Sequence, residues 1–416
     1  MAKKLEEIKE EECPYELPEG WKWKYIADVS TVVTGSTPSK KEIDYYSDKG
    51  GVPFFKPADL DSGRKLYNSS EYLSDKGKNI SKIIPSGSTL VCCIGTIGKS
   101  AYMEVEGTTN QQINAVIPNI NNLYMYYFSN TDIFINQLLE KASAITISIV
   151  NKSKMESCYI PIPPKETQQK IVDIIESLFA KLDIAQEKVE HVLAESENRR
   201  SAILHNAFSG KLTEKWREEN NVSFDSWNEY KIKDIAKNIK DKYDPEKDKF
   251  LNIPYIGLEH IEKNNGIVGF SSSEGVKSIK TLFNKNDVLY GKLRPYLDKH
   301  DIAEYNGMCS TDIIVYRCKL KETAIILNYV MSTKQFIEYA VTNSKGINLP
   351  RTSEKIISEY KLQLPLLTEQ KEIVRLLDKF LSVEDKVKST CQSTLEAIAT
   401  MRKSILAKAF RGELVS

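Results

Sequence analysis

Apolar residues recur at alternating steps of four and three along two stretches of the chain, residues 162–214 and 363–416. So narrow an apolar stripe is typical of a coiled-coil seam rather than of the broader buried face of a helix in a globular domain. The predicted seam residues are Ile171, Ile175, Leu178, Leu182, Ala185 and Val189 in the first stretch, and Ile373, Leu377, Phe380, Val387, Cys391 and Ile405 in the second.

The two stretches are copies of each other. Ile171 returns as Ile373 and Gly210 returns as Gly412, at a constant offset of 202 positions. Proline precedes each copy and glycine closes it, as is common at helix ends. Each copy is therefore predicted to form one long helix, roughly 60 Å for about 40 residues, and to pair antiparallel with the other. Because the two helix ends have similar sequences, each could bind one copy of the same partner. The residues predicted to dock this partner are Ala207, Phe208, Gly210, Ala409, Phe410 and Gly412.

The intervening segments have a different pattern. Residues 21–161 contain short apolar runs bounded by Gly, Pro, Asn and Ser, which predict short strands. Residues 215–362 repeat this pattern more weakly, so that the segment at Trp21 resembles the segment at Trp227. The predicted fold class is α+β: two globular α/β domains separated by an antiparallel two-helix coiled coil, with a pseudo-twofold internal repeat and a loose tail at residues 1–20. Two similar domains with different loops suit a bipartite, asymmetric ligand.

Composition restricts the class of protein. The 416 residues are 28% charged and 41% hydrophobic, and no apolar run approaches the ~18 residues of a membrane span. The first residues, MAKKLEEIKEEE, lack the apolar core of a signal peptide, and the seven cysteines contain no CxxC pair. These features predict a cytoplasmic protein with reduced thiols. A net charge of +1 argues against a uniformly basic nucleic-acid binder but allows a local basic face.

No motif predicts catalysis. Residues 93–100 nearly match the phosphate loop GxxxxGK[ST], but Cys93 replaces the first glycine and no clear helix follows Ser100. A glycine-rich turn is the simpler interpretation. The four histidines have no metal-ligand spacing, so no metal site is predicted. A nucleophile elbow and the motifs of a self-sufficient adenine methyltransferase are also missing.

Basic and amide side chains in the predicted loops are candidates for contacts with DNA. Lys and Arg neutralise phosphates, while Arg, Asn and Gln can read base edges through paired hydrogen bonds. Each one is, taken alone, more often a solvated surface group. The candidates are Lys56, Arg64, Lys82, Lys99, Thr109, Asn110, Gln111 and Gln112 in the first domain, and Lys292, Arg294, Thr311, Lys345 and Arg351 in the second.

The repeated helix ends, Pro…Gln-x-x-Ile-Val and Ile-Leu-x-x-Ala-Phe-x-Gly-x-Leu, resemble those of the specificity subunits of Type I restriction-modification systems. The resemblance covers nearly the whole chain. PFFKPADL at 53–60, the Ile-Gly-x-x-Gly run at 94–98 and Gln-Gln-Ile-Asn-Ala at 111–115 are similar to that family's target-recognition domains. The second domain departs from the pattern, with Ser310-Thr311-Asp312 where the first has Gln-Gln-Ile.

The resemblance implies a function and a set of partners. Each globular domain would bind half of a split site in double-stranded DNA, with the helix pair setting the spacing. The helices would dock two copies of a methylation subunit, and restriction/translocation subunits would complete the complex. This chain would itself be non-catalytic and hold no cofactor. S-adenosylmethionine would lie in the methylation subunit, and ATP and Mg²⁺ in the restriction subunit.

Two other interpretations remain open from the residues alone. A coiled-coil scaffold with two protein- or glycan-binding domains fits the near-neutral charge. An enzyme that uses the Gly98-Lys99-Ser100 loop would bind ATP. Undetectable ATP binding, or binding that Lys99→Ala leaves unchanged, would exclude this interpretation.

Overall fold

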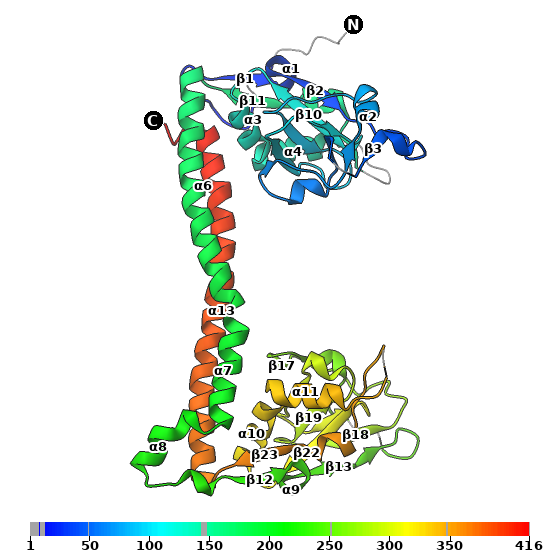
Figure 1. The fold of residues 1–416 in the computed structure, drawn as a ribbon, viewed down its shortest axis with the longest axis vertical. Coiled ribbons are helices and arrows are strands. Elements are labelled where there is room, and N and C mark those ends of the chain that lie inside the picture. The colour runs from blue at the N-terminus through cyan, green and yellow to red at the C-terminus, as the bar shows by residue number, and fades with distance from the viewer. Residues whose placement is uncertain are drawn as a thin grey trace. The chain divides into compact units, whose positions relative to one another are not determined.

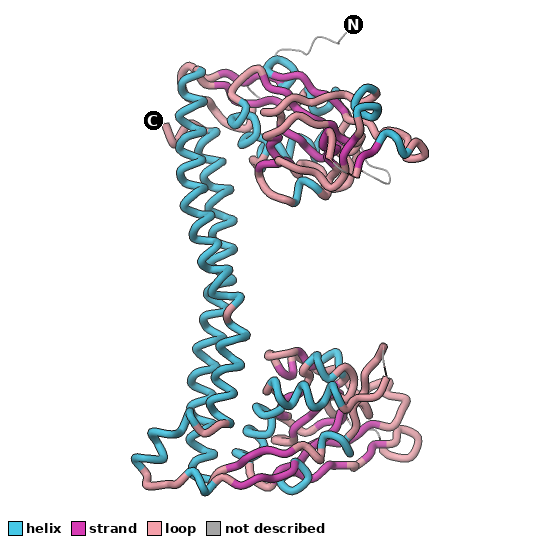
Figure 2. Tube along the Cα trace, viewed as in Figure 1, coloured by secondary structure: helices cyan, strands magenta, loops and turns pink. Residues whose placement is uncertain are grey.

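The computed structural model describes residues 8, 13–48, 50–142, 148–249, 252–346 and 348–415. The chain divides into two compact units (Figures 1 and 2). Unit 1 comprises Met1–Val189 and Ser393–Ser416, and unit 2 comprises Glu190–Gln392. Within the described ranges, no helix is both long enough and apolar enough to cross a membrane.

Long helices from both copies of the repeat run through the units. They are α6 (Lys165–Ala194), α7 (Ser196–Phe208) and α13 (Leu367–Phe410). In unit 1 the start of α6 packs against the end of α13, so that Ile171 and Ile175 share a core with Phe410. In unit 2 the end of α7 packs against the start of α13, where Leu204 meets Ile373. The pairing is therefore antiparallel in each unit, as predicted.

The second copy is one helix of 44 residues, but the first is divided at Glu195, which separates α6 from α7. The prediction of one continuous helix was wrong here. Arg199 supplies a physical reason, because its guanidinium donates a hydrogen bond to the backbone carbonyl of Val192, 3.1 Å away and just before the division. A side chain that bonds to helix backbone in this way is a common cause of a local irregularity.

The seam differs from the heptad prediction at one residue. Phe380 is 39% exposed, while the neighbouring Leu381 is 4% exposed and packs in the core. Leu381 follows Leu377 by four residues, and residues four apart lie on the same face of a helix. Of the other predicted seam residues, those that are buried are Ile171, Ile175, Ile373, Leu377 and Cys391, and those that are half-buried are Leu178, Leu182, Ala185, Val189, Val387 and Ile405.

The described residues of unit 1 form three sheets. A five-stranded sheet has the order β2-β10-β7-β8-β5, a four-stranded sheet β3-β6-β4-β9, and a ribbon pairs β1 with β11. The strands are β1 (Lys22–Tyr25), β2 (Ser30–Thr34), β3 (Tyr46–Ser47), β4 (Val52–Phe55), β5 (Lys65–Leu66), β6 (Tyr72–Leu73), β7 (Thr89–Cys92), β8 (Ser100–Met103), β9 (Thr108–Thr109), β10 (Ile113–Pro118) and β11 (Tyr159–Ile162). The short helices are α1 (Ile26–Val29), η2 (Ile43–Tyr45), η3 (Asp59–Asp61), α2 (Asp75–Asn79), α3 (Asn122–Ser129), α4 (Asp132–Lys141) and α5 (Lys152–Glu156).

Unit 2 repeats this plan. Its sheets have the orders β13-β22-β19-β20 and β14-β18-β21-β15, with the ribbons β12-β23 and β16-β17. The strands are β12 (Asn228–Lys231), β13 (Ala236–Ile239), β14 (Lys242–Tyr243), β15 (Tyr255–Ile256), β16 (Ile261–Glu262), β17 (Gly266–Ile267), β18 (Lys280–Phe283), β19 (Val288–Gly291), β20 (His300–Ile302), β21 (Gly307–Cys309), β22 (Ile313–Cys318) and β23 (Lys361–Leu364). The helices are η4 (Lys211–Thr213), α8 (Glu214–Glu219), η5 (Phe224–Ser226), α9 (Ile232–Ile235), η6 (Leu258–His260), η7 (Pro295–Leu297), α10 (Lys321–Met331), α11 (Lys334–Thr342) and α12 (Glu354–Ile357).

Glycine ends both copies of the long helix for the same steric reason. Gly210 and Gly412 have φ of +77° and +81°, in the left-handed region that side chains disfavour. A Cβ on Gly210 would lie 2.4 Å from the Phe224 ring, and one on Gly412 would lie 2.5 Å from Pro18. The predicted fold class, two α/β domains joined to antiparallel paired helices in a repeated arrangement, is confirmed.

Candidate nucleic-acid interface

Three loops meet at one edge of the larger sheet in unit 1. The turn after β7 begins at Cys93, whose backbone N–H donates to the Gln112 carbonyl at 2.8 Å. The Cys93 carbonyl in turn accepts from the Val150 N–H at 3.0 Å. We call residues 93–99, 109–112 and 148–150 the loop surface of unit 1. Loops held on a rigid sheet in this way are frequent sites of recognition.

Unit 2 builds the same surface with the same backbone bonds. The Lys292 N–H donates to the Asp312 carbonyl at 2.8 Å, and the Thr352 N–H donates to the Lys292 carbonyl at 3.0 Å. Residues 292–299, 310–312, 345–346 and 348–352 form the loop surface of unit 2. The two surfaces share a backbone plan and differ in their side chains.

The glycine-rich turn of unit 1 corresponds to residues 292–299 in unit 2. Cys92 N–H bonds the Lys99 carbonyl and Gly291 N–H bonds the Lys299 carbonyl, both at 2.8 Å. Lys299, not Lys292, is thus the counterpart of Lys99. The extra residue in the second turn hid this equivalence in the sequence.

Each of these lysines bonds its own turn to a neighbouring 3-10 helix. Lys99 Nζ lies 2.5 Å from an Asp61 carboxylate oxygen in η3, and Lys299 Nζ donates to the Leu258 carbonyl in η6 at 2.6 Å. Ser100 then begins strand β8. A phosphate loop opens a helix instead, so the structure favours the glycine-rich turn over the nucleotide site.

Arg294 is the most unusual residue of the second loop surface. Its φ is +49°, at the position where unit 1 has Gly95 with φ of +81°. Its backbone N–H donates to the Pro350 carbonyl at 2.7 Å, and its side chain is exposed. A bulky residue in this left-handed conformation costs free energy, and such residues cluster at functional sites.

Residues 109–112, the amide-rich candidates of unit 1, are partly buried and partly exposed. Thr109 and Asn110 are buried, and the Asn110 side-chain amide donates to the Gln112 side-chain oxygen at 3.0 Å. Gln111 is exposed, and its side-chain oxygen accepts a 2.5 Å bond from the Thr37 hydroxyl. Of these four candidates, Gln111 presents its amide most fully to a ligand.

The basic candidates of unit 1 have partners within the unit. The Arg64 guanidinium pairs with Asp183 of α6 and lies 5.3 Å from the centre of the Phe179 ring. Arg64 thus holds the globular part of unit 1 against helix α6. Lys56 Nζ lies 2.7 Å from Glu71, and a hydrogen bond from this lysine holds the pKa of the Glu71 carboxyl below its usual range.

Lys82 is exposed and donates to the Thr34 carbonyl at 3.0 Å. The sequence could not reveal any of these pairings, because they join residues far apart in the chain.

The candidates of unit 2 gather on its loop surface. Arg351 lies 2.6 Å from Asp312, and its backbone exchanges two hydrogen bonds with Lys345. Lys292 is half-buried, and burial together with the charge of Arg351 lowers the pKa of its ammonium group. Thr311 is exposed on the neighbouring turn. This concentration of cations distinguishes unit 2 from unit 1.

The predicted docking residues lie mostly inside the helix junctions. Ala207, Ala409 and Phe410 are fully buried in the cores, and both glycines are buried against neighbouring rings. Phe208 is half-buried and lines a hollow in unit 2. These positions therefore build the helix junctions.

One junction contains a buried charge network that sequence reasoning missed. The Glu369 carboxylate is fully buried and lies 2.6 Å from the Arg217 guanidinium. It also accepts bonds from the Thr213 hydroxyl at 2.7 Å and the Trp227 indole N–H at 3.1 Å. The network joins α13, η4, α8 and Trp227, the residue directly before β12.

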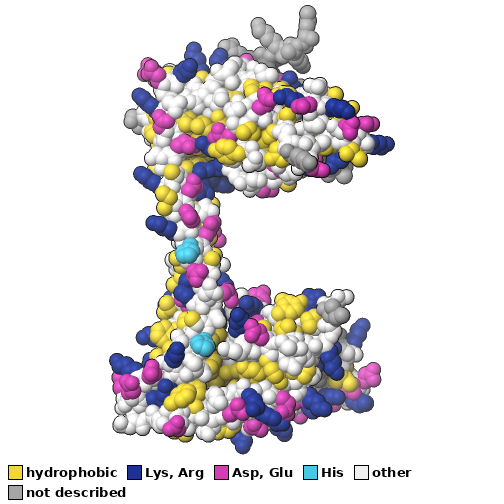
Figure 3. Space-filling model, in the orientation of Figure 1, with side chains coloured by type: hydrophobic (Ala, Val, Ile, Leu, Met, Phe, Trp, Pro, Cys, Tyr) yellow, Lys and Arg dark blue, Asp and Glu magenta, His cyan; other side chains and the backbone are white. Residues whose placement is uncertain are grey.

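Charges of both signs are mixed on the molecular surface. Over the face drawn in Figure 3, Lys and Arg side chains alternate with Asp and Glu on both units. Across the residues with described positions, no group of three His, Cys, Asp or Glu side chains is placed to hold a metal ion.

Comparisons with known proteins agree on one family. The family described as Type I restriction modification DNA specificity domain matches residues 18–194 and 225–397. The chain is 28% identical over 309 residues to the Type I restriction enzyme EcoDI specificity subunit of Escherichia coli, which covers 68% of each chain. It is 22% identical to the EcoKI specificity subunit of E. coli K12, over 96% of this chain and 90% of that one.

Solved structures show the same fold. A chain from a structural study of assembly and conformational transition in the type I R-M system aligns with a TM-score of 0.75 at 18% identity, over 96% of this chain and 100% of that chain. The HsdS subunit from Thermoanaerobacter tengcongensis aligns with a TM-score of 0.61 at 18% identity, over 96% and 99%. With the family matched in both halves and the fold shared along nearly the whole chain, this protein belongs to the DNA specificity subunits of Type I restriction-modification systems.

Proposed function

We propose that each unit reads one half of a split, asymmetric site in double-stranded DNA through its loop surface. The observation that carries this proposal is the repeated backbone plan with unlike side chains, which suits two readers of different half-sites. The paired helices would set the spacing between the half-sites. The scaffold interpretation finds no support among the relatives, which are restriction-modification proteins.

The chemistry of the two surfaces differs in a way that base reading would use. Unit 1 presents the Gln111 amide, and a Gln amide pairs with the N6 and N7 edge of adenine. Unit 2 presents the guanidinium groups of Arg294 and Arg351, which pair with the O6 and N7 edge of guanine. Lys82 and Lys345 are suited to phosphate contacts, which position a protein without specifying sequence.

The chain would perform no chemistry itself. S-adenosylmethionine would be bound by a methylation subunit, two copies of which would dock on the helices, and ATP with Mg²⁺ by a restriction and translocation subunit. The strand that follows the glycine-rich turn supports this assignment, since an ATP-binding loop there would require a helix. A methylation subunit must also flip its target adenine out of the duplex, because the reacting atom is inaccessible in the stack.

Methylome sequencing tests the proposal. A host that expresses this chain with its methylation subunit would be compared with the same host lacking this chain alone. We expect methylated adenines in a split asymmetric motif, and their loss in the deletion strain. An unchanged methylome in the deletion strain would contradict the proposal.

A further inference from the structure

Arg351 and Asp312 form an ion pair at the place where the three loops of unit 2 meet. The Arg351 guanidinium donates to an Asp312 carboxylate oxygen at 2.6 Å. Both side chains are also open to solvent, with 52% of the arginine side chain and 31% of the aspartate side chain exposed. The pair therefore lies on the loop surface of unit 2 and presents polar atoms to a ligand.

Backbone hydrogen bonds hold both residues of the pair in place. The Arg351 N–H donates to the Lys345 carbonyl at 2.8 Å, and the Arg351 carbonyl accepts from the Lys345 N–H at 3.0 Å. The Asp312 carbonyl accepts from the Lys292 N–H at 2.8 Å, and the Asp312 N–H donates to the Ser310 hydroxyl oxygen at 3.2 Å. Two side chains that are anchored and already paired have less conformational freedom to lose when a ligand binds, which favours affinity.

Stability does not explain why a carboxylate lies on this surface. Ion pairs between exposed side chains contribute little to the free energy of unfolding. On a surface that binds DNA, a carboxylate also repels the phosphates that Lys and Arg attract. A contact between Asp312 and a base would explain why this repulsion is tolerated.

Unit 1 has neither charge at the equivalent places. The bridges that join the first loop to the third align Ile149 with Arg351. The carbonyl bonds that join the first loop to the second align Gln112 with Asp312. The shared fold thus builds both positions in each unit, while the guanidinium and the carboxylate belong to unit 2.

The donors and acceptors of the pair match those of one base pair. In the major groove, a G·C pair presents the N7 and O6 acceptors of guanine beside the N4 amino donor of cytosine. The Arg351 guanidinium has further N–H donors beyond the one that bonds to Asp312, so it can bond to both acceptors of guanine. The Asp312 carboxylate can accept from the amino group of cytosine.

We propose that Arg351 and Asp312 together read one G·C pair in the half-site of unit 2, guanine through the guanidinium and cytosine through the carboxylate. Asp312 is then a specificity residue as well as the group that orients Arg351. A C·G pair presents the same groups in the reverse order and would set the guanidinium against the cytosine amino group. This inference rests on the proposed function, and it names the base pair that one part of the loop surface reads.

Selection from randomised DNA tests this assignment. The full chain, assembled with its methylation subunit, would bind a pool of duplexes in which the half-site of unit 2 is random. We expect the wild-type complex to select G·C over the other base pairs at a position where Asp312→Ala lowers the preference by about tenfold or more. The preferences at the other positions and the melting temperature of the variant should stay near wild type.

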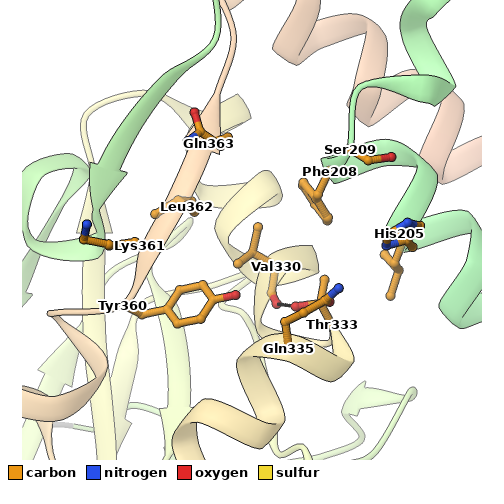
Figure 4. Close-up of a pocket in the computed structure, with 11 residues that line it drawn as sticks. His205, Phe208, Ser209, Val330, Thr333, Gln335, Tyr360, Lys361, Leu362 and Gln363 are labelled. Carbon is orange, nitrogen blue, oxygen red and sulfur yellow. Dashed lines mark hydrogen bonds between the residues drawn. The ribbon is translucent and has the colours of Figure 1, made fainter.

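Glu229→Ala is the matched control. Glu229 forms an ion pair of 2.8 Å with Lys361 on the ribbon β12-β23, outside the loop surface. Figure 4 shows Lys361 on this ribbon, at the wall of the hollow that Phe208 lines. The control removes one negative charge from an ion pair of unit 2, as Asp312→Ala does, and should select the wild-type half-site.

A modified base separates direct reading from a purely positioning role. In the selected G·C pair, cytosine would be replaced by 2-pyrimidinone, which lacks the 4-amino group. We expect this replacement to weaken binding of the wild-type complex about tenfold more than binding of the Asp312→Ala complex, because only wild type loses a hydrogen bond to a charged group. An equal effect on both complexes would overturn the contact between Asp312 and cytosine.

The outcomes for this pair and for the proposed function are distinguishable. If Asp312→Ala selects the same half-site as wild type, or alters the preference at a base pair other than G·C, the pair does not read G·C, while the proposed function stands. If the wild-type complex selects no half-site from the pool, the proposed function is wrong and the base assignment fails with it.

Discussion

Arg294 shows how one residue can combine a conformational cost with a recognition role. Its φ of +49° lies in the region that unit 1 fills with glycine. An L-residue there costs roughly 1–2 kcal/mol, and within the described residues of unit 2 the exposed Arg294 guanidinium makes no hydrogen bond or ion pair. A contact between the Arg294 side chain and DNA would explain why this conformational cost is retained.

The variant Arg294→Gly separates these two effects. We expect an unchanged or slightly raised melting temperature, because glycine relieves the backbone strain. We also expect relaxed preference at one base pair of the second half-site, worth about 1–3 kcal/mol, as measured by titration of base-substituted duplexes. Unaltered preference at every position would show that Arg294 reads no base.

The surroundings of His300 predict that the stability of unit 2 depends on pH. The histidine is buried, its Nδ1 lies 2.7 Å from Asn328 Oδ1, and its Nε2 lies 3.0 Å from Asp298 Oδ1. Burial by itself lowers the pKa of the imidazole, but the hydrogen bonds and charge of Asp298 outweigh it, so the pKa is raised above 6.5.

The folded state binds the His300 proton more tightly than the unfolded state does. Protonated His300 therefore stabilises the fold in full below the pKa that its imidazole has in the unfolded chain, about 6.5. This stabilisation is lost as pH rises through the higher pKa of the imidazole in the folded state. We expect the free energy of unfolding to fall across this window, measured by urea denaturation. The variant His300→Gln should show a flatter profile. The same pH slope in both proteins would exclude His300 as its source.

At the scale of elements, the long helices are specified by a buried face only a few residues wide. Phe380 and Leu381 are adjacent, yet only Leu381 belongs to the core. This pair offers a matched test of the seam.

We expect Leu381→Asp to lower the free energy of unfolding by about 3 kcal/mol or more, because it combines a lost apolar contact with a buried charge. Phe380→Asp should cost less than about 1 kcal/mol, as most exposed substitutions do. Chemical denaturation monitored by circular dichroism would compare them. A larger loss for Phe380→Asp than for Leu381→Asp would mean that the heptad position, not the observed one, faces the core.

The Glu369 network gives a second prediction at this scale. Arg217→Ala leaves the fully buried carboxylate without its cation, and we expect a loss of about 3–5 kcal/mol. The double variant Arg217→Leu with Glu369→Leu removes both charges and should recover much of that loss. A double variant no more stable than Arg217→Ala alone would show that packing of the arginine stem, rather than the charge, dominates.

For the whole molecule, the repeat implies two independent readers. The loop surfaces of unit 1 and unit 2 share no residue, so substitutions on them should act separately. We expect Gln111→Ala to change preference only in one half-site and Arg294→Gly only in the other. In the double variant, the losses of binding free energy should add to within about 0.5 kcal/mol, as measured by fluorescence anisotropy. Strong non-additivity would indicate that both surfaces contact the same half-site.

The sequence by itself determined the features that depend on near neighbours along the chain. The apolar ladder from Ile373 to Leu377 predicts a helix with one buried face, and the glycines at 210 and 412 mark where it ends. The constant offset of 202 shows that the two halves share one plan. Such signals are local, so periodicity and repetition reveal them without knowledge of any distant contact.

Only the tertiary structure decided which side chains are available for recognition. Arg64 and Asp183 are 119 residues apart, and Tyr15 and Phe410 are 395 apart, yet each pair is in contact. The same is true of the equivalence between Lys99 and Lys299 and of the strain at Arg294. These features depend on which distant segments the fold brings together, and a pattern along one chain does not contain that information.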